Sequence, residues 1–190
     1  MLWGMPSDRR PSAPTSRHSA GAQPAQMNDG SQEELFSTET TRLTVFTDGS
    51  CLGNPGRGGW AWIVPGGRFA SGAEPSSTNQ RMEVRAVLEA LRALEGPVLV
   101  ASDSAYVVNC FQQKWWVGWQ RRNWRNASGH PVANQDLGEP LLGLALDPGR
   151  SVKFKKVQGH SGDPLNDLVD RLAVEAATDG SGRTGTGSPF

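Results

Sequence analysis

Hydrophobic and polar positions recur along the chain with two different periods, and each period predicts its own kind of element. Short runs of β-branched and aromatic residues, bounded by Gly, Pro or Asp, predict strands at residues 43–50, 60–64, 68–73, 98–101 and 152–157. Residues 79–95 place Glu83 and four apolar residues at helical spacing, and Gly96-Pro97 then ends the pattern. We expect further helices from residue 104, near residues 134–145 and at residues 164–177.

The order of these elements indicates a single α/β domain. The first three strands favour an antiparallel meander, because Pro65-Gly66-Gly67 is a tight-turn signal between the second and the third. Later strands alternate with helices, and the continuous apolar run at 98–101 is typical of a central strand covered on both faces. We therefore predict a five-stranded mixed sheet, a meander plus parallel strands, with helices on both faces.

The two ends of the chain lack this patterning. Residues 1–42 are rich in Ser, Thr and Pro, and they cannot bury enough surface to offset the entropy of ordering. We expect a disordered tail there, although its arginines also faintly resemble an organelle transit peptide, and translation could begin at Met1 or at Met27. Residues 179–190 predict a second, flexible tail, which leaves 43–178 as the domain.

Composition narrows the class of protein. The chain has 190 residues, and none of its apolar runs approaches the ~18 residues that a membrane-spanning helix needs. Cys51 and Cys110 lie far apart, which argues against a disulfide framework or a cysteine zinc site and favours a reducing cytoplasm. The 19 basic and 19 acidic residues balance, which at first argues against a nucleic-acid partner, but the two signs are segregated along the chain.

Four acidic residues occupy positions from which they could meet. Asp48 and Asp103 lie at the carboxyl ends of predicted strands, where ligand sites of open α/β sheets gather. Glu83 and Asp170 lie on the apolar sides of predicted helices, where a carboxylate is costly unless something positive pairs with it. Converging carboxylates favour a hard divalent cation, Mg²⁺ or Mn²⁺. Taken singly, each acid could instead be a turn former, a helix cap or a surface residue.

Four short motifs that include these acids resemble the motifs of type 1 ribonuclease H. They are TDGSCLGNPG (residues 47–56), TNQRME (residues 78–83), SDSAYV (residues 102–107) and GHSG (residues 159–162). Asn166 and Asp170 follow the last motif, as they do in the family. The motifs stand in the family's order, and the resemblance covers essentially all of residues 43–178, so it implies a ribonuclease H-like fold.

The resemblance also implies an activity. It implies an endonuclease that hydrolyses the RNA strand of an RNA–DNA hybrid and leaves 5′-phosphate and 3′-hydroxyl ends. The metal ligands carried over by motif position, for two Mg²⁺ ions with Mn²⁺ as a substitute, are Asp48, Glu83, Asp103 and Asp170. His160 would shuttle a proton or help the product leave. The family commonly has Glu directly after Asn166, whereas this chain has Asp167, which could assist Asp170.

The resemblance further implies contacts to the hybrid. An amide can both donate to and accept from the 2′-hydroxyl that distinguishes RNA from DNA. The amide side chains that the motifs place near the substrate are Asn54, Asn79, Gln80 and Asn166. A basic segment without acids, residues 104–135, looks like the family's basic protrusion and would bind the DNA strand through Trp115, Trp119, Arg121, Arg122, Trp124 and Arg125.

Two features of these basic residues stay open. The tryptophans of the protrusion follow a helical face, so they could equally form a small satellite core. A second basic group borders the last predicted strand, where its residues could bind phosphate or only protect a sheet edge: Arg150, Lys153, Lys155 and Lys156.

Two rival functions remain. A nuclease of the same superfamily that acts on DNA is disfavoured by the amides, and a catalytically silent hybrid-binding module is disfavoured by the intact acids. The residues indicate neither a membrane nor an obligate protein partner, and we expect a cytoplasmic monomer. Because no separate hybrid-binding module is recognisable, affinity and processivity stay open.

Overall fold

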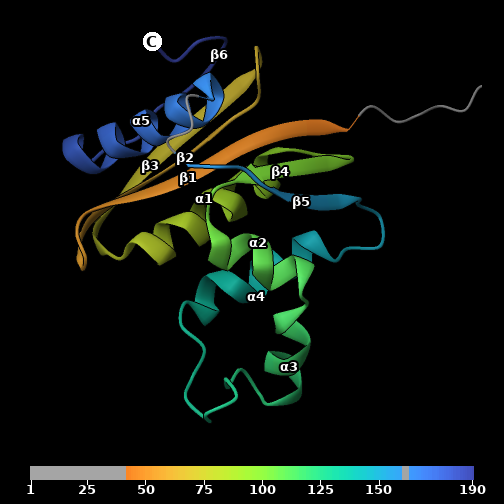
Figure 1. The fold of residues 1–190 in the computed structure, drawn as a ribbon. Helices are drawn as coiled ribbons and strands as arrows, with labels where there is room; N and C mark the ends of the chain where they lie inside the picture. The colour runs from red at the N-terminus through yellow and green to blue at the C-terminus, as the bar shows by residue number, and fades with distance from the viewer. Residues whose placement is uncertain (1–41, 160–162) are drawn as a thin grey trace, which may run out of the picture. The chain divides into compact units, whose positions relative to one another are not determined.

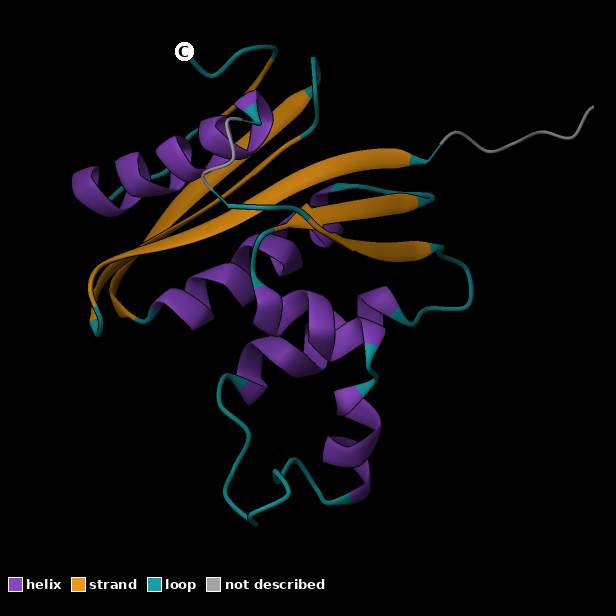
Figure 2. Cartoon of the chain, in the orientation of Figure 1, coloured by secondary structure: helices purple, strands orange, loops and turns teal. Residues whose placement is uncertain are grey.

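A computed structural model describes residues 42–159 and 163–190 of the chain. In this part of the chain, a mixed sheet carries helices on both faces (Figure 1 and Figure 2). The strands are β1 (Leu43–Gly53), β2 (Gly56–Ile63), β3 (Arg68–Ser77), β4 (Val98–Ser102), β5 (Val152–Lys156) and β6 (Thr184–Thr186). The helices are α1 (Asn79–Ala93), α2 (Ala105–Gln112), α3 (Trp115–Arg121), α4 (Gln135–Ala145) and α5 (Pro164–Asp179).

The strands follow the order β5-β4-β1-β2-β3-β6. Neighbours on the β2, β3 and β6 side of β1 are antiparallel, whereas β1, β4 and β5 run parallel to one another. The predicted α/β fold with a meander and parallel strands is therefore confirmed. The predicted count of five strands is wrong, because the sheet has six.

Alternation along β1 sends neighbouring side chains into two separate cores. Val45 packs with Val87 and Leu91 of α1 on one face of the sheet. Phe46 packs with Val169 and Leu172 of α5 on the other face. Helices α2 and α4 lie on the α1 side, while α5 alone lies on the opposite side (Figure 1). The sheet therefore forms the middle layer between two helical layers. Residues of β1 contact α1 on one face and α5 on the other.

Both ends of α1 are held by side chains. Thr78 caps the start, where its Oγ1 accepts from the backbone N–H of Arg81 at 3.3 Å. At the other end, the Arg150 guanidinium donates to the carbonyl oxygens of Leu91 at 2.8 Å and Leu94 at 2.5 Å. These carbonyls lack partners inside the helix, so Arg150 has a structural task that sets it apart from the lysines near it in sequence.

The segment 179–190 differs from the flexible tail that its sequence predicts. It contains β6, which pairs antiparallel with the outer edge of β3. The backbone N–H of Ser71 donates to the Arg183 carbonyl at 2.8 Å. Gly182 approaches β3 so closely that a Cβ would lie 2.0 Å from the Ser71 carbonyl oxygen. A strand of three residues with a glycine at its centre shows no apolar alternation, which is why the sequence gives no signal for it.

No helix in the described parts of the chain is both long and apolar enough to cross a membrane.

Candidate active site

Asp48 and Asp103 lie just past the point where the parallel pairing of β1 with β4 ends. The prediction that Asp48 stands at the carboxyl end of a strand is wrong, because β1 continues to Gly53 in its pairing with β2, whereas Asp103 directly follows β4. The ladder between β1 and β4 pairs Phe46 with Ala101. Two residues after Phe46 the chain reaches Asp48, and two residues after Ala101 it reaches Asp103. Because side chains two residues apart point to the same face of a strand, both carboxylates point to one side of the sheet. The structure thus brings these two predicted residues together.

Glu83 reaches this pair because β1 has no side chain at Gly49. A Cβ on Gly49 would lie only 2.2 Å from the backbone nitrogen of Glu83, so α1 lies directly against the strand. The backbone N–H of Gly49 also donates to Asp48 Oδ1 at 2.7 Å. Gly49 therefore has two roles. Its missing side chain lets the helix that carries Glu83 approach, and its backbone N–H binds the carboxylate of Asp48.

A second glycine allows the last acid to approach from the opposite face. A Cβ on Gly59 of β2 would lie 2.1 Å from the carbonyl oxygen of Ala173, so α5 also packs directly on the sheet. Asp170 of α5 is half-buried, and its charge acts on Asp48. Asp167, one turn earlier on the same helix, is exposed. The placement of these side chains favours Asp170 over Asp167 as the fourth member of the group.

The pKa of Asp48 shows how strongly the four carboxylates interact. Burial raises this pKa most, and the negative charge of Asp103 raises it further. The hydrogen bond from the neighbouring backbone N–H lowers it, while Asp170 and Glu83 raise it again, and the result is about 8 against an ordinary 3.8. Within residues 42–159 and 163–190, none of the four acids forms an ion pair with a basic side chain.

A hydroxyl group orients one of these acids. Ser104 Oγ donates to Glu83 Oε2 at 2.6 Å, and it accepts from the backbone N–H of Val107 at 3.3 Å, where it caps α2. Burial raises the pKa of Glu83, the hydrogen bond from Ser104 lowers it, and the charge of Asp103 raises it. No sequence pattern marks Ser104 as a partner of Glu83. Its position directly after Asp103 was a signal, but its partner lies 21 positions away.

The chemistry of this group fits a divalent cation. All of its donors are carboxylate oxygens, the ligands that hard divalent cations prefer. The repulsion that raises the pKa of Asp48 is what a bound cation would relieve. The fit is one of donor chemistry and not of finished geometry, because among the described residues no three His, Cys, Asp or Glu side chains already stand close enough together to hold a metal ion. His160, the predicted proton shuttle, lies outside the described residues.

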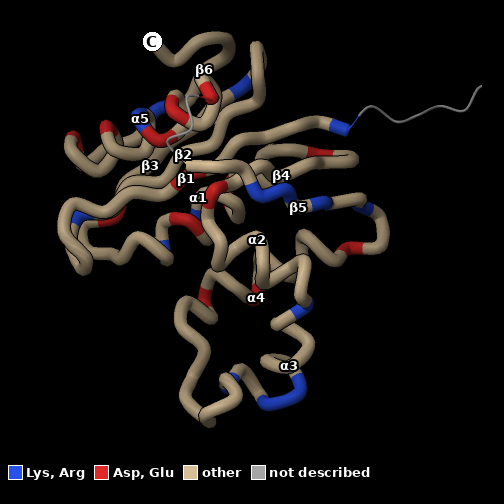
Figure 3. Tube along the Cα trace, in the orientation of Figure 1, with Lys and Arg blue, Asp and Glu red and all other residues tan. Residues whose placement is uncertain are grey.

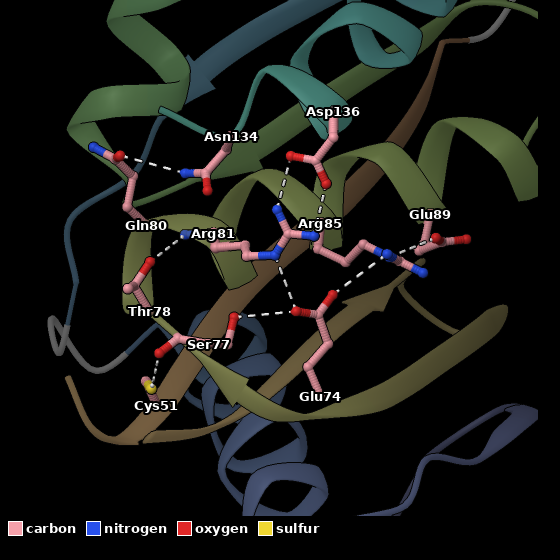
Figure 4. A network of polar contacts seen from close by, with 10 residues as sticks. All are labelled: Cys51, Glu74, Ser77, Thr78, Gln80, Arg81, Arg85, Glu89, Asn134 and Asp136. Carbon is pink, nitrogen blue, oxygen red and sulfur yellow. Dashed lines mark hydrogen bonds and ion pairs between the residues drawn. The ribbon is translucent and has the colours of Figure 1, made fainter. Parts of the chain in front are cut away.

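Arginines near the start of α1 hold a different set of acids in an ion-pair network (Figure 4). Arg81 donates from both of its Nη atoms to Asp136 of α4, at 2.9 and 2.8 Å, and from Nε to Glu74 of β3 at 3.0 Å. These hydrogen bonds, first of all the ones to Asp136, hold the pKa of Arg81 well above its usual range. Glu74 also accepts from Arg85 at 3.4 Å. The network ties the start of α1 to β3 and to α4.

Three of the predicted substrate amides gather at the same end of α1. Asn54, in the turn between β1 and β2, accepts through Oδ1 from the backbone N–H of Asn79 at 3.4 Å. Both of these side chains are exposed. Gln80 Oε1 accepts from the Asn134 side chain at 3.4 Å (Figure 4). Asn166 differs from them, because it is only 2% exposed and its Oδ1 has no hydrogen-bond partner among the described residues.

The tryptophans of the basic protrusion pack against one another. Trp119 of α3 has its ring centroid 6.0 Å from that of Trp124 and 6.3 Å from that of Tyr106, and Trp115 lies 6.1 Å from Tyr106. All three tryptophans are half-buried, which agrees with the satellite core that the sequence left open. Figure 3 marks the basic positions of this segment along the backbone. The basic residues are all exposed: Lys114, Arg121, Arg122 and Arg125.

Comparison with known proteins identifies relatives for the described domain. The family model for RNase H matches residues 40–178. A protein named ribonuclease H from Nitratidesulfovibrio vulgaris is 51% identical over 141 residues, which are 72% of this chain and 89% of that protein. Proteins of the same name from Thermus thermophilus and Chlorobium luteolum are 48% and 46% identical and are covered over 84% and 94% of their lengths, against 72% and 71% of this chain.

Solved structures share the fold. A crystal structure of a type 1 RNase H with the type 2 active-site motif matches with a TM-score of 0.65 and 31% identity, over 77% of this chain and 78% of that one. A foamy viral protease–reverse transcriptase in complex with an RNA/DNA hybrid matches with a TM-score of 0.58. At 20% identity, over 72% of this chain and 20% of that one, the second likeness shows the fold alone.

Proposed function

Because the chain belongs to the ribonuclease H family, we propose that it is an endonuclease that hydrolyses the RNA strand of RNA–DNA hybrids by two-metal-ion catalysis. The products would carry 5′-phosphate and 3′-hydroxyl ends. The working ion would be Mg²⁺, with Mn²⁺ as a substitute, and the enzyme would act as a cytoplasmic monomer. The observation that carries the proposal is the convergence of carboxylates from separate elements, because Asp103, Asp170 and Glu83 all lie close enough to act on the buried carboxylate of Asp48.

The chain's own residues would hold and orient the ions. When bound, two divalent ions activate a water molecule and stabilise the leaving 3′ oxygen. The ligands would be Asp48, Glu83, Asp103 and Asp170. The raised pKa of Asp48 lets a cation displace its proton close to neutral pH, which makes ion binding pH-dependent. The hydroxyl of Ser104 engages one oxygen of Glu83, which leaves the other oxygen for the ion. His160 stays the predicted proton carrier.

The hybrid would be held on both sides of this group. Asn54, Asn79 and Gln80 would contact the RNA strand, since amides can both donate to and accept from a 2′-hydroxyl. The first two are exposed, and Gln80 is half-buried. The arginines of the protrusion would bind phosphates of the DNA strand, with the tryptophan cluster as their rigid support. Asn166 would act from beneath this surface, because its side chain is buried.

A substrate panel tests the proposal. The full chain is assayed in Mg²⁺ on an RNA–DNA hybrid, a DNA duplex and an RNA duplex of one sequence, and only the RNA of the hybrid should be cut. Asp103→Asn should lose cleavage while keeping its circular dichroism spectrum. Glu95→Gln, an exposed carboxylate past the end of α1, is the matched control and should cleave normally.

Each rival function has its own outcome in this panel. Cleavage of the DNA duplex would instead indicate a nuclease that acts on DNA. Hybrid binding without turnover in any divalent ion would indicate a silent binding module. Cleavage that survives Asp103→Asn would overturn the assignment of the site.

A further inference from the structure

A second basic surface lies on β5, close to the carboxylates. Lys153 and Lys155 are exposed, and neither forms an ion pair with a described acid. Figure 3 shows this strand as a basic stretch at the edge of the sheet. Arg150 does not belong to the surface, because its guanidinium is used at the end of α1. The two lysines therefore present charges that no contact within the described residues uses.

The strand register places these lysines in line with the carboxylates. Strand β5 pairs with β4 so that Lys155 lies opposite Ala101 and Lys153 lies one row further back. Two residues past Ala101, the chain reaches Asp103. Because residues two apart share a face, Lys153, Lys155 and Asp103 point to the same side of the sheet, in rows about 7 Å apart. Along β5, Lys155 is therefore nearer to the carboxylates and Lys153 is the next residue on the same face.

This side of β4 and β5 carries no described helix. Helix α5, the only helix on that side, packs on β1, β2 and β3, and Figure 1 shows it over that half of the sheet. Leu99, which lies opposite Lys153, is only half-buried, whereas Val98 and Val100 on the other face of β4 are fully buried. Within residues 42–159 and 163–190, this face is therefore left uncovered by any helix on the way to the carboxylates.

We propose that this open face carries the cleaved RNA strand past the active site, with Lys155 and Lys153 each binding one of its phosphates. The proposal rests on the proposed function, because it takes the scissile phosphate to lie at the carboxylates. An RNA backbone that continues from that point over β4 and β5 passes the two lysines in turn. Their ammonium groups are unpaired point charges on flexible stems, which suits contacts to backbone phosphates.

Salt-dependent binding tests the proposal without cleavage. The full chain carrying Asp103→Asn is titrated with a labelled RNA–DNA hybrid at several salt concentrations. Lys155→Gln and Lys153→Gln should each lower the slope of log affinity against log salt by roughly 0.7–0.9, the value for one lost phosphate contact, and together they should weaken binding several-fold at low salt. The matched control is Lys156→Gln, on the same strand but pointing to the opposite face, and it should leave the slope unchanged.

Shortened strands identify which backbone the lysines bind. The effect of Lys155→Gln should vanish with a hybrid whose RNA ends at the cleavage site on one side, and it should persist when only the DNA is shortened. Equal slopes for Lys155→Gln and Lys156→Gln, or an effect that follows the DNA strand, would overturn the proposal. A shift in sedimentation without a change in affinity would assign the face to a second copy of the chain and overturn it too.

Failure of the underlying function is distinguishable from failure of this inference. The former appears as an absence of hybrid cleavage by the unmodified chain. The latter appears in the salt slopes, which are measured on a variant that does not cleave.

Discussion

Two groups of acidic residues lie beside α1, and their surroundings are opposite. Glu74 and Asp136 are bound by Arg81 at 2.8–3.0 Å, and Glu89 is bound by Arg85 at 2.8 Å. Near the middle of β1 and the end of β4, Glu83 and Asp48 have only a hydroxyl, a backbone amide and other carboxylates as described polar partners. The same helix thus borders a neutralised network and an uncompensated cluster.

The difference separates residues that hold the fold from residues that prepare a site. Ion pairs at the start of α1 are satisfied within the protein, so they fix the helix against β3 and α4. The carboxylates of the cluster repel one another, which costs stability until a cation or a proton arrives. A group of acids that the fold brings together without neutralising them indicates a functional site, because the repulsion costs stability that the fold alone does not recover.

The sharpest test of the uncompensated cluster compares two acids of α5. Asp170→Asn should lower hybrid cleavage by roughly a thousandfold, about 4 kcal/mol, because it removes the charge of a proposed metal ligand. Asp167→Asn, one turn away and exposed, should stay within a few-fold of the unmodified chain. The measurement is kcat/KM on the hybrid, with circular dichroism to check folding. Comparable losses in both variants would mean that both acids belong to the cluster.

The neutralised network is tested through Arg81. Arg81→Met leaves Glu74 and Asp136 without their shared cation, and we expect it to lower the free energy of unfolding by roughly 2 kcal/mol. Partial exposure of the pairs keeps this figure below that of a fully buried pair. Arg92→Met, which removes an exposed i,i+3 partner of Glu89, should cost no more than about 0.5 kcal/mol. Urea denaturation compares the two, and equal losses would show that the network adds nothing beyond its single pairs.

Removing a charge from the uncompensated cluster should stabilise the fold, whereas removing Arg81 from the network should destabilise it. Asp48→Asn should raise the free energy of unfolding by roughly 1–2 kcal/mol near pH 8 in a chelating buffer, because a buried and repelled carboxylate disappears. The folded-state pKa of about 8 lies above the ordinary 3.8, so the folded protein binds this proton more readily than the unfolded chain. The unmodified chain should therefore lose stability relative to the variant as pH rises from about 4 to about 8.

Thermal melts across this pH range check the prediction. The curves of the two proteins should converge at acidic pH, where Asp48 is protonated in both states. Parallel curves would mean that Asp48 does not titrate in this range.

The smallest expected effect concerns the hydroxyl that orients Glu83. Ser104→Ala removes the donor to Glu83 Oε2 and should lower kcat by about tenfold or less, with little change in KM. The loss should grow at acidic pH, because the hydrogen bond lowers the pKa of Glu83 and its removal makes protonation easier. Ser104→Thr keeps the hydroxyl and should restore most of the activity. An equal loss in both variants would overturn the role of the hydroxyl, because threonine keeps it.

The local pattern singled out the acids of the cluster: Asp103 directly follows β4, and Glu83 and Asp170 lie on helices. It misplaced the end of β1, because the strand continues past Asp48 to Gly53 through its pairing with β2. The partners of these acids were not predictable. Ser104 and Arg81 lie inside motifs that the sequence makes visible, but what they bind is 21 and 55 positions away. Arg150 seemed to belong with the lysines that follow it, yet it caps a helix more than fifty positions earlier. Local periodicity reports which face a residue occupies, whereas its partner depends on how distant elements pack.

Strand β6 follows every other element along the chain, and this order has a consequence for synthesis. A ribosome releases the chain from its N-terminal side, so the meander and α5 can assemble before β6 is available. During that interval the outer edge of β3 has unpaired backbone groups, which are a template for pairing with another nascent chain. The three residues of β6 add little to the core. By pairing with β3 after the rest of the sheet has formed, they would end the period in which this edge can aggregate.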